Sequence, residues 1–270
     1  MTPGGAPSGV VLDLDGVLLA AGEPIAGAAS AVEELARAGY PCAVLTNMTS
    51  RGPEHISARL ADAGIRVPAA RIVTAAVATA QLVRSEHAGK RVLLVAERGS
   101  EQQFAGCLLV DRPPADLVVV GGPDESWTLE LLDRALRALQ GGARLIAMQD
   151  NAWWLSREGP RLDSGSYVRA LAHAAGVRPR VIGKPAAAIF RSACRTLGRP
   201  PANCVMVGDD LRNDVLAAQR VGMRGVFVRT GKGSSFANDP RTERADAILG
   251  SVAELPAWLE ALSVAAGSGA

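Results

Sequence analysis

Two aspartates separated by one residue, Asp13 and Asp15, follow a short apolar run near the start of the chain. Residues two apart on an extended strand point to the same side, so we expect both carboxylates to face one small volume at the end of a strand. Open α/β sheets bind their ligands at the carboxyl ends of the strands. Crowded carboxylates repel each other unless a cation or a shared proton relieves them, and a hard divalent cation prefers oxygen ligands. The pair therefore indicates that one aspartate attacks a phosphoryl group while the other moves the proton.

A second group of acids, Asp209, Asp210 and Asp214, follows the apolar run 205–207 and Gly208. A helix is predicted to begin there, and the amino terminus of a helix favours anionic groups. Taken alone, the pattern is also typical of a helix cap followed by acids in the first turn. If the two acid-bearing strands are neighbours, however, their carboxylates converge.

Two smaller motifs carry groups suited to phosphate. Thr46 and Asn47 end a predicted strand and offer a hydroxyl, an amide and backbone N–H groups, although an ordinary polar turn explains them equally well. Lys184 lies between a glycine and a proline, and the chain has lysine only at positions 90, 184 and 232. In a chain that otherwise uses arginine, a retained lysine suggests a need for a compact ammonium group.

Strand and helix patterns alternate along the chain, which predicts a mainly parallel sheet covered by helices. Expected strands cover residues 10–13, 42–46, 71–74, 92–96, 117–120, 145–148, 205–207, 225–228 and 247–249. Expected helices cover residues 27–37, 53–63, 75–86, 100–104, 129–139, 166–175, 187–197 and 211–221, with a last helix after the capping box 251–254.

Glycine- and proline-rich stretches near Gly89 and over 177–185 are typical of joints between domains. We expect a core built from residues 1–77 and 181–270, with a second α/β domain, 78–180, inserted between them. A segment of that length is a usual size for a domain. A single long sheet would give a similar alternation, so this alternative stays open.

The composition excludes several classes of protein. With 270 residues, 48% of them hydrophobic, the chain can form one large domain or two modest ones. A net charge of +2 and only 4% aromatic residues argue against a nucleic-acid or membrane surface. The four cysteines form no CxxC motif and are expected to be buried free thiols in a reducing compartment. Neither a signal peptide nor a membrane span is recognisable, so we expect a cytoplasmic protein.

Some motifs give weaker signals. The stretch 225–232 resembles a P-loop, but its glycine spacing is wrong and a glycine replaces the required Ser or Thr. Trp153 and Trp154 are interpreted first as core or interface residues, and second as a specificity element together with Asp150 and Asp163. The segment 163–166 predicts the start of a helix. Surface or packing roles are expected for the three histidines, His55, His87 and His173.

In order along the chain, DLDGV, LTN, GKP and GDDxxxD resemble the four motifs of the haloacid dehalogenase-like superfamily. Their order, and the long gap between the second and third motifs, are similar to the NagD-like subfamily IIA. Within it, the stretch 183–232 with its GDDLRNDV and VRTGK sequences is most similar to the phospholysine phosphohistidine inorganic pyrophosphate phosphatases. The resemblance implies an α/β fold, with a Rossmann-like parallel-sheet core and an inserted α/β cap domain of the C2 type.

The resemblance also implies roles for the acids. Asp13 would be the nucleophile that forms an aspartyl-phosphate, and Asp15 would protonate the leaving oxygen and then activate water. Mg²⁺ would be held by Asp13, by the backbone carbonyl of Asp15 and by Asp209. Either Asp214 or Asp210 would support the metal shell.

By the same resemblance, Thr46 and Asn47 would bind the phosphoryl oxygens, and Lys184 would neutralise charge on the nucleophile and the phosphate. The chain departs from the family pattern at Met48, where many relatives have a polar residue, and over 149–154, where the usual TNPD sequence is missing. These departures leave the choice of substrate open.

The sequence thus predicts a Mg²⁺-dependent phosphatase whose partner is a small phosphorylated substrate, with no nucleic-acid or membrane partner. The resemblance implies a homodimer. Two alternatives stay open: a phosphomutase, and a non-catalytic ligand-binding or regulatory protein on the same fold.

Overall fold

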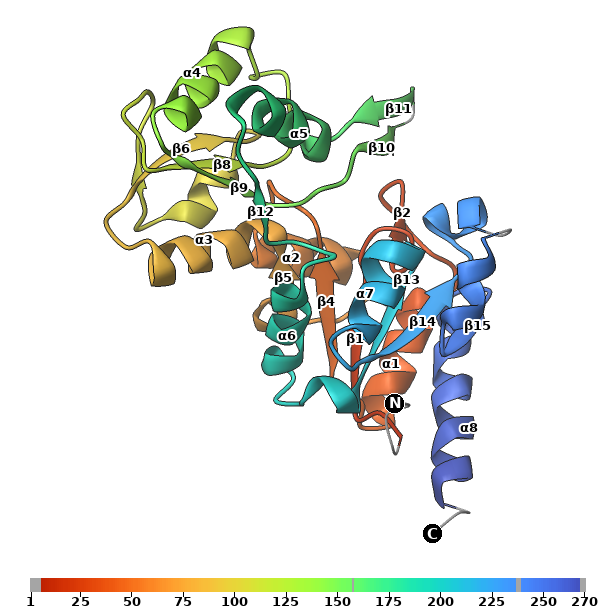
Figure 1. Ribbon diagram of the computed structural model, residues 1–270. Coiled ribbons are helices and arrows are strands. Elements are labelled where there is room, and N and C mark those ends of the chain that lie inside the picture. Colours follow the sequence, from red (N-terminus) through yellow and green to blue (C-terminus); the bar gives the residue numbers. More distant parts are fainter. Residues whose placement is uncertain (1–5, 157, 237–238, 268–270) are drawn as a thin grey trace. The chain divides into compact units, whose positions relative to one another are not determined.

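The chain forms two units, seen in the computed structural model of Figure 1, which describes residues 6–156, 158–236 and 239–267. The first unit contains the described parts of Met1–Thr46, Pro53–Val73 and Pro185–Ala270. The second contains Asn47–Gly52 and Thr74–Lys184. Compared with the expected division, the second unit is a few residues longer at each end. It also includes the short segment 47–52, whose flanking residues on both sides belong to the first unit.

A six-stranded sheet forms the centre of the first unit. Its strands are β1 (Gly9–Leu12), β4 (Cys42–Thr46), β5 (Ile72–Thr74), β13 (Cys204–Gly208), β14 (Arg224–Val228) and β15 (Ala247–Leu249). Their order across the sheet is β15-β14-β13-β1-β4-β5, and the pairings from β15 to β4 are parallel. β1 therefore lies between β13 and β4, although about two thirds of the sequence separates β1 from β13. The expected Rossmann-like α/β core is confirmed.

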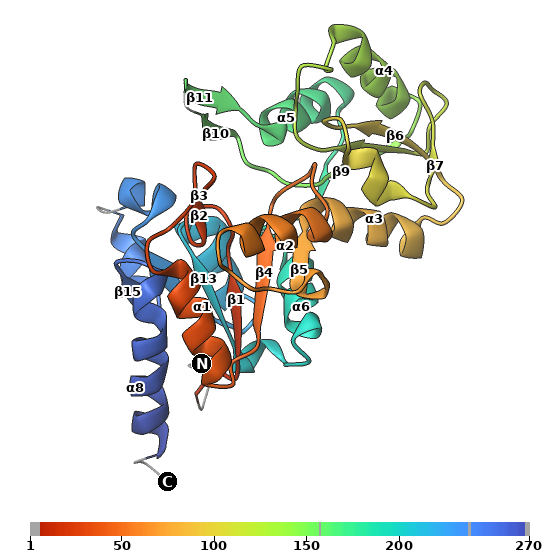
Figure 2. The same cartoon turned by 180° about the vertical axis from the view of Figure 1, so that it is seen from behind.

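Helices cover both faces of this sheet. They are α1 (Ala28–Arg37), α2 (Pro53–Asp62), α6 (Ala187–Thr196), α7 (Leu216–Gln219) and α8 (Leu255–Gly267). Figures 1 and 2 show α6 and α7 on one face and α1 and α2 on the other, while α8 contacts α1. The central strands β1, β4 and β13 are buried along their whole length, which explains why they read as continuous apolar runs instead of alternating patterns.

Short turns complete the first unit. The small hairpin β2 (Leu19–Ala20) and β3 (Glu23–Pro24) follows β1. A π-helical turn, η4 (Leu211–Val215), precedes α7, so the expected helix 211–221 begins in a wider turn than an α-helix. The remaining turns are 3₁₀-helical: η1 (Ala69–Arg71), η3 (Pro201–Asn203), η5 (Gly231–Phe236), η6 (Pro240–Arg244) and η7 (Val252–Glu254).

The second unit contains a separate five-stranded sheet, all of whose pairings are parallel, in the order β12-β9-β8-β6-β7. Its strands are β6 (Arg91–Val95), β7 (Leu108–Leu109), β8 (Leu117–Val120), β9 (Arg144–Ala147) and β12 (Arg180–Val181). Its helical elements are α3 (Ala75–Glu86), η2 (Ser100–Phe104), α4 (Leu129–Gln140) and α5 (Ser164–Ala175).

The core of the second unit shows how strand alternation places its side chains. Leu117 and Val119 pack with residues of α3, whereas Val118 and Val120 pack with residues of α4 and α5. Successive strand residues point to opposite faces, so each face of β8 is covered by its own helix layer. The helices start at residues that cap them with a side-chain oxygen, which are Thr74, Thr128 and Asp163.

A hairpin that was not expected, β10 (Trp153–Ser156) with β11 (Gly159–Leu162), also belongs to the second unit. Trp153 and Trp154 lie on it with about half of each side chain exposed, at 51% and 43%. The interpretation of these two residues as core residues is therefore wrong. The two tryptophans occupy adjacent strand positions and point to opposite faces, so one layer cannot bury both.

Across the described ranges, no helix is both long enough and apolar enough to cross a membrane. Three of the cysteines, Cys42, Cys194 and Cys204, are buried, Cys107 is partly buried, and all four are free thiols. Burial raises the pKa of Cys42 to about 12.

Candidate active site

The two acid motifs meet because β1 and β13 are neighbouring parallel strands. Leu12 pairs with Val207 at the end of the ladder, and the backbone N–H of Asp13 donates to the carbonyl of Val207 at 2.9 Å. Asp13 directly follows β1 and Asp209 directly follows β13, so both lie at the same edge of the sheet, one register position apart. Both side chains are buried, with 7% and 4% of their surface exposed.

A third buried carboxylate, Asp214, joins this pair from the π-helical turn η4. Among the described residues, Asp13, Asp209 and Asp214 form a group whose ligand oxygens all lie within 4.8 Å of one another. Three buried carboxylates at such distances repel strongly unless a cation neutralises them. An all-oxygen set of this charge fits Mg²⁺. Asp214, which the sequence analysis placed in a supporting role, thus lies directly with the other two.

Glycines allow the backbone to approach Asp209 closely. A Cβ atom at Gly16 would lie 1.9 Å from Oδ2 of Asp209, and a Cβ atom at Gly231 would lie 2.1 Å from the same oxygen. Both glycines also have positive φ angles, +86° and +57°, which L-residues with side chains rarely adopt. The backbone of two segments therefore lies against the carboxylate of Asp209, at positions where a side chain on either segment would not fit.

The segment 230–232 orients Asp209, and the sequence analysis did not assign it this role. The backbone N–H of Lys232 donates to Oδ2 of Asp209 at 2.6 Å, and the hydroxyl of Thr230 donates to the carbonyl of Gly16. These bonds connect the loop after β14 to both acid motifs. The VRTGK sequence, part of the family resemblance, is the signal that identifies this loop.

Asp15 differs from Asp13 in its surroundings. β1 ends at Leu12, and Asp15 lies beyond it as an exposed residue between buried neighbours, with a bridge to Leu19. β1 ends before the pair begins, so strand alternation does not determine how the two side chains are placed, and their expected convergence stays a prediction. The Asp15 carboxylate is not in the three-carboxylate group of the described residues.

Thr46 is the last residue of β4, the strand on the other side of β1, and it is buried. Val44 pairs with Leu12. Parallel neighbours end at the same edge of a sheet, so Asp13, Thr46 and Asp209 all lie at the carboxyl ends of three adjacent strands.

Asn47 and Lys184 form a hydrogen-bonded pair in the second unit. Oδ1 of Asn47 accepts the backbone N–H of Lys184 at 2.8 Å, and Nδ2 of Asn47 donates to the carbonyl of Lys184 at 3.0 Å. The amide group thus holds both polar groups of one backbone residue, and the Lys184 side chain is buried. This geometry shows Asn47 positioning Lys184, while its expected contact with phosphate stays a prediction.

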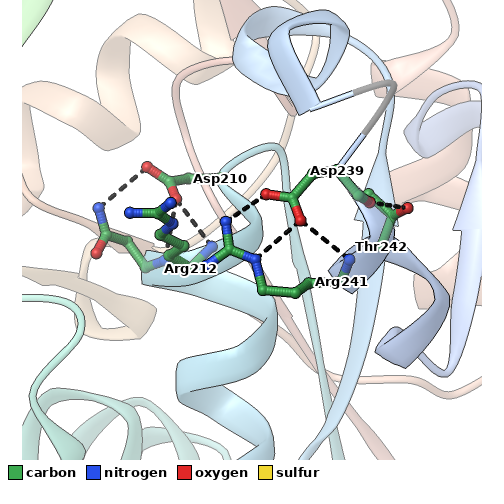
Figure 3. A network of polar contacts seen from close by, with 6 residues as sticks. Asp210, Arg212, Asp239, Arg241 and Thr242 are labelled. Carbon is green, nitrogen blue, oxygen red and sulfur yellow. Dashed lines mark hydrogen bonds and ion pairs between the residues drawn. The ribbon is translucent and has the colours of Figure 1, made fainter.

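Asp210 caps the turn η4, on which Asp214 lies, and Figure 3 shows its carboxylate beside Arg212. Its Oδ1 accepts the backbone N–H groups of Arg212 and Asn213, each at 3.0 Å, and its Oδ2 accepts the Asn213 side chain at 3.0 Å. Of the two acids proposed to support a metal, Asp214 lies in the carboxylate group and Asp210 holds the turn beneath it.

An ion pair appears in the same view. Arg241 donates to Asp239 through Nε at 2.8 Å and through its backbone N–H at 3.0 Å (Figure 3). The hydrogen bond from the Arg241 guanidinium holds the pKa of Asp239 at about 2. This pair is separate from the carboxylate group and provides a useful control for it.

Comparison with family models identifies two regions of the chain. Residues 10–108 match the haloacid dehalogenase-like hydrolase model, and residues 181–255 match a second model described as HAD-hydrolase-like. The matched regions contain all four motifs that carry the resemblance.

Individual proteins agree with this match. A phospholysine phosphohistidine inorganic pyrophosphate phosphatase from Danio rerio is 32% identical over 89% of this chain and 90% of its own length. Among solved structures, the p-nitrophenyl phosphatase from Archaeoglobus fulgidus has a TM-score of 0.87 at 28% identity, covering 94% of this chain and 99% of that one. NagD from E. coli K-12 has a TM-score of 0.81 at 29% identity, covering 92% and 98%.

Proposed function

Because the chain belongs to the haloacid dehalogenase-like hydrolases, we propose that it is a Mg²⁺-dependent phosphatase that hydrolyses a small phosphorylated metabolite through an aspartyl-phosphate. The observation that supports this most directly is the group of buried carboxylates of Asp13, Asp209 and Asp214. The resemblance to phosphatases of known structure supports the reaction class.

In the first step, a carboxylate oxygen of Asp13 attacks phosphorus and the bond from phosphorus to the leaving oxygen breaks. Asp15 donates a proton to that oxygen, so the product leaves as an alcohol. Asp15 is itself exposed, which suits a group that must exchange protons with substrate and water.

In the second step, Asp15 takes a proton from a water molecule whose oxygen attacks phosphorus. The bond between Asp13 and phosphorus breaks, which regenerates the carboxylate and releases inorganic phosphate. Asp13, Asp209 and the backbone carbonyl of Asp15 would hold Mg²⁺, with Asp214 beside them. When bound, this ion supplies charge neutralisation for the phosphoryl oxygens.

Positive charge and hydrogen-bond donors for the phosphoryl oxygens would come from Lys184, Thr46 and the segment that begins at Asn47. Phosphoryl transfer depends mainly on positioning and charge neutralisation. The buried Lys184, held by Asn47 through two hydrogen bonds, meets both requirements. The relatives carry different substrate names, so we propose the substrate class only as a small phosphate monoester.

The proposal is tested by phosphate release from p-nitrophenyl phosphate with Mg²⁺ and with EDTA. We expect turnover only with the metal, and a loss of at least about 10³-fold in Asp13→Asn. Asp62→Asn, an exposed aspartate at the end of α2, is the matched control and should retain wild-type activity. Metal binding without phosphate release would favour a binding protein, and recovery of the phosphate on a second hydroxyl of the substrate would favour a phosphomutase.

A further inference from the structure

The segment Asn47–Gly52 leaves the core strand β4 and returns to the core helix α2, yet its contacts place it in the second unit. It directly follows Thr46, so it is the loop that would meet phosphoryl oxygens in the proposed phosphatase. What holds this short segment therefore decides how its first residue, Asn47, is placed.

Thr49 is the anchor of the segment. It is 5% exposed, its carbonyl accepts the hydroxyl of Ser100 at 2.9 Å, and its Oγ1 accepts the backbone N–H of Gly122 at 3.1 Å. The Thr49 hydroxyl then donates its one proton to Oε1 of Glu97. A buried hydroxyl that both accepts and donates has a fixed orientation, and losing one partner leaves a buried polar group unsatisfied.

Glu97 completes this arrangement. Its backbone N–H donates to the carbonyl of Gly122 at 2.7 Å, and its side chain accepts from the hydroxyls of Thr49 and Ser50. The residue lies between β6 and η2, about fifty positions from Thr49 in the sequence. Glu97 thus joins the segment 47–52 to the loops after two strands of the second sheet.

A single residue separates Thr49 from Asn47 along the backbone. The intervening Met48 is also tied, because its carbonyl accepts the N–H of Ala76 at 3.4 Å. Asn47 in turn holds both backbone groups of Lys184. A displacement of Thr49 is therefore passed through a short, bonded stretch of chain to the lysine.

We propose that Glu97 is a positioning residue of the phosphatase, which fixes Asn47 and Lys184 by holding the Thr49 hydroxyl. The inference rests on the proposed function, because it assigns Glu97 a role in placing groups that bind phosphate. Misplacing a catalytic group by about 1 Å can cost about 10²-fold in rate, so a residue outside the reacting group can have a large effect.

The surroundings of Glu97 add a dependence on pH. Burial raises the pKa of Glu97 above its ordinary value, the hydrogen bonds from Thr49 and Ser50 lower it, and the carboxylates of Asp124 and Asp163 raise it. The ionised carboxylate accepts both hydroxyl protons, whereas the protonated form must itself donate one. Hence the Thr49 contact weakens as the pH falls through the raised pKa.

The free energy of unfolding depends on pH in the opposite direction. Since the folded-state pKa of Glu97 lies above the unfolded value, the folded state binds more protons between the two, and its stability falls as the pH rises through that interval. Removing the charge in Glu97→Gln should therefore leave the protein at least as stable at neutral pH. A loss of activity without a loss of stability separates positioning from folding.

The test compares E97A, E97Q, T49V and T49S with wild type, using p-nitrophenyl phosphate and Mg²⁺. We expect E97A and T49V to lose about 10- to 100-fold in kcat/KM, and the conservative T49S and E97Q to retain activity within about threefold. E97Q keeps an oxygen that accepts from Thr49, and it does not titrate. Its kcat/KM relative to wild type should therefore rise as the pH is lowered. The matched control is E101Q, an exposed glutamate in η2, which should behave as wild type.

Hydrogen exchange of the amides in 47–52 gives a readout that does not depend on turnover. We expect faster exchange in E97A and T49V than in wild type and E101Q. The proposal is overturned if folded E97A has wild-type kcat/KM, or if exchange in 47–52 is unchanged. If wild type itself releases no phosphate, the proposed function fails. Hydrogen exchange in E97A then still tests whether Glu97 holds the segment 47–52: faster exchange supports this role, and unchanged exchange contradicts it.

Discussion

The acids and the lysine of the proposed active site are held by two different kinds of structure. In the first unit, Asp13 and Asp209 follow neighbouring parallel strands, and the register of the sheet fixes their separation. In the second unit, Lys184 is held by hydrogen bonds from one side chain, Asn47, whose own segment depends on Thr49. The pairing of a sheet leaves the residues at its edge little freedom to move, whereas side-chain hydrogen bonds can be removed one at a time by substitution.

This difference predicts separable effects. Changes among the carboxylates should alter metal binding, and changes around Lys184 should alter catalysis while metal binding persists. Substitutions at Asp209, Lys184 and Asp210 test whether metal binding and catalysis can be lost independently.

Asp209→Asn should reduce phosphatase activity by at least about 10³-fold and abolish stabilisation by Mg²⁺. Neutralising one of three crowded carboxylates relieves their repulsion, so the metal-free variant should be more stable than metal-free wild type by roughly 1 kcal/mol. Wild type should overtake it once Mg²⁺ is added, because a ligand that binds only the folded state stabilises it. Thermal unfolding with and without Mg²⁺ measures both signs, with Asp62→Asn as the control. Equal Mg²⁺ stabilisation in variant and wild type would contradict the assignment of the metal site.

Lys184→Arg should lose about 10²-fold in kcat/KM, yet keep the Mg²⁺-dependent rise in stability. Arginine retains the charge but replaces a compact ammonium with a planar group of different reach, and the buried position gives it little room. Lys90→Arg, an exposed lysine in the same unit, is the matched control and should be neutral. If Lys184→Arg also lost Mg²⁺ stabilisation, the lysine and the carboxylates would not be separable.

The sequence was sufficient to predict those parts of the fold that depend on local pattern. The elements at 75–86, 117–120 and 247–249 have the expected bounds, because each is a regular apolar pattern between clear start and stop signals. The convergence of Asp13 with Asp209 was also predictable, since both follow buried strands and parallel strands share an edge.

Other features carry no periodic signal. The contact between Thr49 and Glu97 joins two loops, and periodicity reports which face of an element is buried without showing which loops meet. Strand alternation does not extend to Asp13 and Asp15, because β1 ends at Leu12. The hairpin with Trp153 and Trp154 was missed because aromatic residues suggest burial, although an exposed hairpin also accepts them.

The smallest effect is expected where a side chain supports the carboxylates without belonging to them. Asp210→Ala removes the cap of η4 and the three hydrogen bonds that Asp210 accepts, which should lower the free energy of unfolding by about 1 kcal/mol. Because Asp214 lies on that turn, Mg²⁺ affinity should also weaken several-fold. Arg241→Ala, which removes the nearby ion pair with Asp239 (Figure 3), should change neither quantity measurably, since exposed pairs contribute little. Chemical denaturation and Mg²⁺ titration of the two variants would show whether the sheet edge alone fixes the carboxylates. If Asp210→Ala kept full Mg²⁺ affinity, the register of β1 and β13 would be sufficient to place the carboxylates. They would then differ even more from Lys184, whose placement depends on side-chain hydrogen bonds.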